Sequence, residues 1–90
     1  MRVARTLFIT GRVQGVGFRY FTRDVATREG LTGWVCNLAD GRVQAYLEGE
    51  AEAVTRVERF LRQGPGSGHV RDVTASDEPA SGAYSRFEIR

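Results

Sequence analysis

The sequence predicts an α+β fold in which an antiparallel sheet carries two helices on one face. Three observations predict it. Five short segments alternate apolar and polar residues as strands do, and two longer segments repeat apolar residues at helical spacing. Their order along the chain is β-α-β-β-α-β, followed by one more strand. Ninety residues suffice for one compact domain and are too few for two, so we expect residues 1–90 to form a single domain.

The first strand is predicted at Val3–Thr10, where Leu7 and Ile9 share one face. The first helix is predicted at Phe18–Glu29, because its apolar residues recur at helical spacing and Gly30 can end it in a left-handed conformation. Its predicted core positions are Phe18, Phe21, Val25 and Ala26.

A hairpin and a second helix follow. The segments Leu31–Asn37 and Arg42–Glu48 alternate as strands on either side of an Asp-Gly turn, which is a strong hairpin signal. The second helix spans Glu50–Gln63, with acidic residues near its start and arginines later, and Gly64-Pro65 ends it. Its apolar stripe consists of Val54, Val57, Phe60 and Leu61.

Two more strands complete the chain, at Val70–Asp77 and Tyr84–Ile89, with a turn containing Pro79 and Gly82 between them. This order of elements folds as two right-handed split β-α-β units, which predicts a ferredoxin-like fold. The first strand then lies at the centre of the sheet. The turn that follows it should open beside the end of the second strand, where Asn37 stands.

The segment GRVQGVGFR at 11–19 joins the first strand to the first helix through a glycine-rich turn that suits an anion. Gly15 and Gly17 allow positive φ angles, and the free N–H groups of the first helical turn can bind phosphate. Arg19 adds a fork of charged donors that matches phosphoryl oxygens. The predicted phosphate-binding residues, acting mainly through backbone N–H groups, are Gln14, Gly15, Val16, Gly17, Phe18 and Arg19.

Several functional classes are excluded or disfavoured. The loop lacks the third glycine of the dinucleotide fingerprint, and the chain has no Gly-Lys-Ser/Thr motif for a nucleoside triphosphate. The net charge is only +2 and the charges are dispersed, so we expect no nucleic acid and no membrane as partner. Aromatic residues on a ferredoxin-like sheet can stack RNA bases, but Phe18, Phe21 and Trp34 are interpreted as core. A single cysteine, with no signal peptide, favours the cytoplasm.

Other reactive side chains receive no role from the sequence. Cys36 alternates with Asn37 and should point to the opposite sheet face, and its single plausible base, His69, lies in a distant loop segment. No spacing of His or Cys predicts a metal site, and no cofactor is expected. Asp40 is interpreted as a turn former, and the acidic residues in general as solvated surface.

The segments GRVQGVGFR at 11–19 and GWVCNLADGRV at 33–43 together resemble the two signature segments of the acylphosphatase family. The resemblance covers essentially the whole chain, with the same order of elements. It implies a small, metal-free enzyme that hydrolyses the carboxyl-phosphate anhydride of acyl phosphates, with Arg19 binding phosphate and Asn37 placing the water. Cys36 departs from the family pattern, which commonly has a longer, often basic residue there.

Some alternatives stay open at the level of sequence. A module of this kind also begins a much larger carbamoyl-phosphate-handling maturation protein, and a related domain could bind phosphate without turnover. We expect a freestanding, monomeric enzyme that takes small acyl phosphates as substrates and binds inorganic phosphate or similar anions. Acetyl, carbamoyl and glyceroyl phosphates all fit, because the motif addresses the phosphoryl end only.

Overall fold

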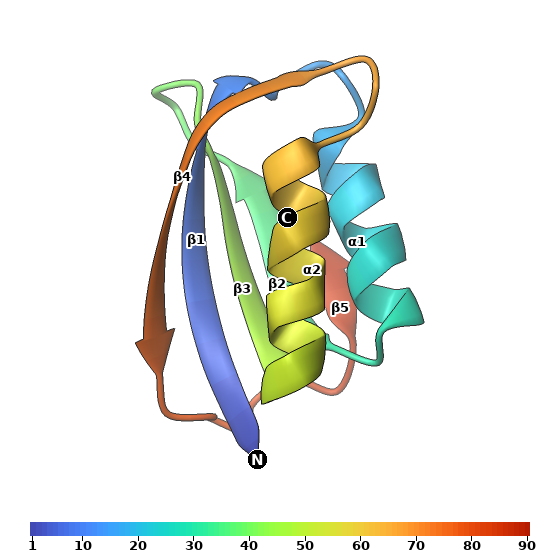
Figure 1. Ribbon diagram of the computed structural model, residues 1–90, viewed down its shortest axis with the longest axis vertical. Coiled ribbons are helices and arrows are strands. Elements are labelled where there is room, and N and C mark those ends of the chain that lie inside the picture. The colour runs from blue at the N-terminus through green and yellow to red at the C-terminus, as the bar shows by residue number, and fades with distance from the viewer.

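The computed structural model describes residues 1–90 as a five-stranded sheet with both helices packed on one face (Figure 1). The elements are β1 (Arg2–Arg12), α1 (Phe18–Arg28), β2 (Thr32–Asn37), β3 (Val43–Glu50), α2 (Ala51–Gln63), β4 (His69–Glu78) and β5 (Phe87–Ile89). All seven predicted elements are present. Most of their bounds differ from the predicted ones by one or two residues, whereas β5 begins three residues later than the predicted Tyr84.

The strands lie in the order β4-β1-β3-β2-β5. The ferredoxin-like prediction is confirmed, with two corrections. The sheet is mixed, because β5 pairs parallel to β2 while the other pairs are antiparallel. This direction follows from the topology: the chain reverses after β4, and β2 also runs opposite to β4. Because β5 adds a strand beyond β2, the middle strand is β3, and β1 lies beside it rather than at the centre.

The hydrophobic core lies between the sheet and the helices. Leu7 and Ile9 of β1 lie on the same face of the strand, as predicted, and this face is the buried one. The helices contribute most of the predicted positions, which are Phe18, Val25, Ala26, Val54, Val57 and Leu61. Phe60 was predicted to belong to the apolar stripe, but it is 42% exposed because it lies at the edge of that stripe.

The face of the sheet opposite the helices carries an aromatic cluster. Trp34 was predicted to be core, but it is half-buried and alternates with Val35, which points toward the helices. Its ring stacks on Tyr46 with centroids 6.0 Å apart, and its indole N–H donates to the Tyr84 hydroxyl at 3.2 Å. Tyr46 and Tyr84 are also in contact, with centroids 5.3 Å apart.

The acidic residues were interpreted as solvated surface, but this interpretation is wrong for Glu48. Its side chain is fully buried on the face of the sheet opposite the helices. Its carboxylate accepts hydrogen bonds from the Tyr46 hydroxyl (2.6 Å) and from the Ser81 hydroxyl (2.8 Å). The backbone N–H groups of Ser81 (3.1 Å) and Gly82 (2.7 Å) donate to it as well. Burial alone would raise the pKa of Glu48, but these hydrogen bonds lower it to about 2. The carboxylate thereby anchors the crossover segment, residues 79–86, which leads from β4 to β5.

Candidate active site

The site begins at the loop between β1 and α1, whose conformation depends on two glycines. Gly15 has φ 73° and Gly17 has φ 78°, both in the left-handed region. A Cβ atom at either position would meet nothing within 4 Å, so the requirement is for the backbone angle and not for space. Gly17 is the N-cap of α1 and makes no side-chain capping hydrogen bond. The first N–H groups of the helix therefore have no capping side chain and can bind an anion.

A cavity of about 150 Å³ lies beside this loop. It is lined by Val13, Gly15, Gly17, Phe18, Arg19, Tyr20 and Asn37. Arg19, from the first turn of α1, and Asn37, the last residue of β2, thus meet at one cavity, although they lie on separate elements. The topology explains why: β1 and β2 both run antiparallel to β3, so their carboxyl ends lie at the same edge of the sheet.

Two residues of the predicted phosphate loop, Gln14 and Val16, do not line the cavity. The Gln14 side-chain amide donates to the backbone oxygens of Leu38 (2.8 Å) and Arg42 (2.9 Å). These carbonyls lie at either side of the turn between β2 and β3, which is at the same end of the sheet as the loop (Figure 1). Gln14 therefore connects the loop to the turn that follows Asn37. The only sign of this contact in the sequence is a long amide side chain within a glycine-rich turn.

Arg19 makes one hydrogen bond within the protein. Its Nη1 donates to the backbone oxygen of Arg90 at 3.2 Å. Arg90 is itself held at the end of β5, because its N–H donates to the Val35 oxygen at 2.8 Å and its guanidinium lies 4.9 Å from the centroid of the Trp34 ring. The remaining guanidinium N–H groups of Arg19 are free to bind a ligand.

Asn37 is exposed, and its side-chain amide makes no hydrogen bond to the protein. Both its carbonyl oxygen and its NH₂ group can therefore contact a ligand or a water molecule. Its neighbour Cys36 is half-buried with a free thiol, and strand alternation directs it to the other face. His69 lies at the start of β4, where it pairs with Arg12 of β1, and not in a loop as predicted.

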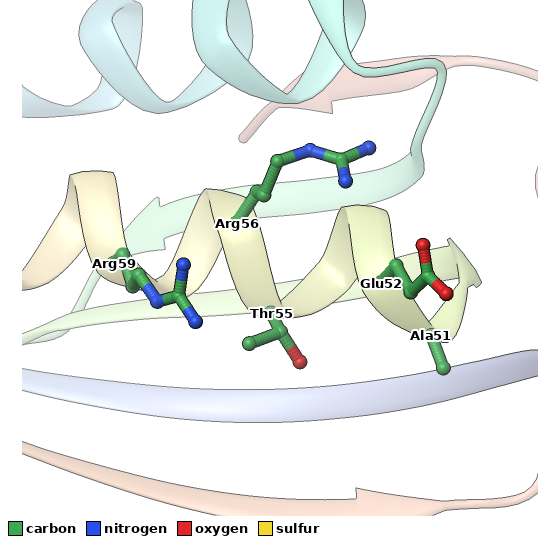
Figure 2. A pocket seen from close by; sticks show the side chains of 5 residues that line it. All are labelled: Ala51, Glu52, Thr55, Arg56 and Arg59. Atoms are coloured by element: carbon green, nitrogen blue, oxygen red, sulfur yellow. The ribbon is translucent and has the colours of Figure 1, made fainter.

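Two larger hollows lie elsewhere. One, of about 420 Å³, runs along α2 and is lined by Ala51, Glu52, Thr55, Arg56 and Arg59 (Figure 2). Arg56 pairs with Glu29 at 2.8 Å, and Thr55 accepts a hydrogen bond from Arg5 at 3.3 Å. The other hollow, of about 540 Å³, lies at the start of the same helix. Neither hollow contains a residue that the sequence predicts for phosphate binding or catalysis.

Two further features bear on ligands. No group of three or more His, Cys, Asp or Glu side chains is arranged to hold a metal ion. Neither helix is long and apolar enough to cross a membrane.

A helix N-terminus with free N–H groups, next to an arginine with free donors, is typical of proteins that bind small phosphorylated molecules. Comparison with known proteins shows the family to which this chain belongs. The family model for acylphosphatase matches residues 5–89, and the chain belongs to the acylphosphatase family. The protein is therefore a hydrolase that acts on acyl phosphates.

Relatives and solved structures agree with this membership. The chain is 50% identical over 84 residues to an acylphosphatase of Rubrobacter xylanophilus, covering 93% of this chain and 76% of that protein. It is 47% identical over 91 residues to an acylphosphatase of Pyrobaculum arsenaticum, covering 99% and 96% respectively. The crystal structure of acylphosphatase from Bacillus subtilis superimposes with a TM-score of 0.94 at 34% identity, covering 98% of both chains.

The same fold also occurs within a longer protein. Full-length HypF, solved in a phosphate- and nucleotide-bound form, matches with a TM-score of 0.87 at 26% identity. The match covers all of this chain but only 12% of HypF. The Pyrobaculum relative, in contrast, is covered almost entirely, so this chain corresponds to nearly the whole of that acylphosphatase.

Proposed function

We propose that the loop between β1 and α1 and Arg19 bind the phosphoryl group of an acyl phosphate, and that Asn37 places the water that attacks it. The observation that carries this proposal is the shared cavity: Arg19 and Asn37 line it together with Gly15 and Gly17. The bound phosphate would sit at the N-terminus of α1, where backbone N–H groups and the helix dipole favour negative charge.

The chemistry needs no strong acid at the leaving group. Cleavage of the carboxyl-phosphate anhydride releases a carboxylate, whose conjugate acid has a pKa of about 4. Such a group leaves without being protonated. This accounts for a cavity lined by one arginine and one asparagine and by no carboxylate or histidine.

The attacking water requires orientation in line with the scissile bond. The carbonyl oxygen of Asn37 would accept a hydrogen bond from this water, and a phosphoryl oxygen of the substrate would take its proton. Arg19 and the loop N–H groups would neutralise the phosphoryl oxygens during the transfer. We propose that these groups suffice and that the reaction proceeds without a metal ion or other cofactor.

We further propose that residues 1–90 act as one domain, as a cytoplasmic monomer, on a small-molecule substrate and with neither nucleic acid nor membrane as partner. Two sequence properties support this proposal. The net charge is only +2 with the charges dispersed, and a single cysteine allows no internal disulfide.

Hydrolysis of benzoyl phosphate, followed by ultraviolet absorbance with EDTA present, tests the proposed mechanism and the roles of Arg19 and Asn37. We expect turnover that survives chelation and falls strongly in both Arg19→Ala and Asn37→Ala. Arg59→Ala is a matched control, because Arg59 is exposed on α2 and makes no ion pair or hydrogen bond within the protein. Loss of turnover on chelation would refute the metal-free mechanism, and full activity in either active-site variant would refute the role given to that residue.

A further inference from the structure

Tyr20 is one of three large apolar or aromatic side chains that the fold leaves exposed, with 56% of its surface accessible. The other two, Met1 and Phe60, line neither the active-site cavity nor its loop. Tyr20 does line that cavity, next to Arg19. We propose that the Tyr20 ring is an acyl subsite, which favours acyl phosphates whose acyl group is planar and apolar; the inference rests on the function proposed above.

The size of the cavity indicates where the acyl group lies. Its volume of about 150 Å³ is well below the roughly 300 to 1,000 Å³ of pockets that enclose a drug-sized ligand. A phosphoryl group held by the loop and Arg19 would take up much of this space. The acyl group must then project through the mouth of the cavity, where it meets the side chains that line the rim.

Tyr20 stands at this rim because of its place in α1. It is the third residue of the helix, and side chains on an α-helix lean toward its N-terminus. The ring therefore leans toward the phosphate loop and not along the helix. Its hydroxyl makes no hydrogen bond within the protein, so no intramolecular partner turns it away from a ligand.

Arg23 supports the ring from one side. Its guanidinium carbon lies 5.4 Å from the centroid of the Tyr20 ring, one helical turn further along. The carboxylate nearest to Arg23 is that of Asp24, at 3.7 Å and with both side chains substantially exposed, so this ion pair competes weakly for the guanidinium. With Arg23 on one side, the other side of the ring can receive an acyl group.

A flat acyl group gains more from this ring than a small one does. Contacts between aromatic rings change binding by about twofold to tenfold beyond the effect of area alone. A benzoyl group can lie against Tyr20, whereas the methyl group of an acetyl group covers little of it. The subsite should therefore appear as a preference in kcat/KM for benzoyl phosphate over acetyl phosphate.

The test compares kcat/KM for these two substrates in the unmodified protein, Tyr20→Ala, Tyr20→Phe and Phe60→Ala. We expect Tyr20→Ala to lower the value for benzoyl phosphate by about fivefold to tenfold and that for acetyl phosphate by less than about twofold. Tyr20→Phe keeps the ring and should retain the preference. Phe60→Ala removes an exposed aromatic side chain of α2 and should change neither value.

Equal losses on both substrates in Tyr20→Ala would overturn the inference, because they would indicate damage to the loop or to Arg19. An unchanged ratio with unchanged rates would overturn it as well, since the ring would then contact neither acyl group. If the unmodified protein hydrolyses neither substrate, the proposed function itself fails, and this outcome differs from a loss of preference with activity retained.

Discussion

Replacing Glu48 by glutamine removes the charge that anchors the crossover segment while nearly preserving the shape of the side chain. One carboxylate oxygen accepts from Tyr46 and from both the hydroxyl and the N–H of Ser81, and the other accepts from the Gly82 N–H at 2.7 Å. Glutamine has one acceptor oxygen and one NH₂ group, which only donates. Its NH₂ group would therefore face at least one of the hydroxyl or N–H groups that donate to Glu48. We therefore expect Glu48→Gln to destabilise the fold.

The magnitude follows from the pKa of Glu48. Burial raises it, the hydrogen bonds lower it, and the net result is a change from 4.5 to about 2 on folding. A change of this size corresponds to at most about 3 kcal/mol of stability for the ionised form. Because the folded pKa is the lower one, this contribution is fully present above about pH 4.5 and is lost as the pH falls through about 2.

Urea unfolding followed by circular dichroism measures this effect. At about pH 7 we expect Glu48→Gln to lower the free energy of unfolding by about 2 to 3 kcal/mol, and the difference from the unmodified protein to shrink steadily toward pH 2. Asp72→Asn is the control, because Asp72 is an exposed strand carboxylate without an ion pair. Equal stability at pH 7, or a difference that does not depend on pH, would refute this account of the anchor.

Two further predictions concern the active-site loop. Gln14→Leu removes the two hydrogen bonds to the backbone oxygens of Leu38 and Arg42, so the turn after Asn37 loses its position. We expect kcat to fall about tenfold with phosphate affinity nearly unchanged. Steady-state kinetics with phosphate as a competing ligand measures both quantities, and an equal loss of phosphate affinity would contradict this prediction. Gly17→Ala imposes a side chain on φ 78° and should cost about 1 to 2 kcal/mol in urea unfolding. Gly66→Ala, where the backbone angle is unstrained and a Cβ would meet nothing within 4 Å, should cost little, and equal effects in the two variants would show that the left-handed angle is not what matters.

The elements could be predicted because the signals for helices, strands and turns are local. For the candidate site, the order of these elements was enough to predict that Arg19 and Asn37 lie near one another. Alternation placed Leu7 and Ile9 on one shared face of β1, and the split β-α-β order brought the ends of β1 and β2 to one edge of the sheet. Arg19 lies in the helix that follows β1, and Asn37 is the last residue of β2, so the topology brings both residues to one cavity.

The features that the sequence did not reveal depend on contacts between distant segments. Glu48 is buried because residues more than thirty positions later fold over it, and no local pattern marks such a partner. The contact between Arg19 and Arg90 likewise arises only once β5 has paired with β2. Alternation showed that Trp34 and Val35 face opposite sides, but not which side the helices would cover.

The division of roles between Arg19 and Asn37 is the central claim, and one measurement tests it most directly: the affinity for inorganic phosphate in Arg19→Ala and Asn37→Ala, by titration calorimetry, beside the turnover of each variant. We predict that Arg19→Ala loses phosphate affinity and about 10² to 10⁴ in rate, because a charge-assisted contact in the site disappears. Asn37→Ala should bind phosphate nearly as the unmodified protein does and lose turnover only. Equal loss of phosphate affinity in both variants would contradict the account, because Asn37 would then bind phosphate and not position water.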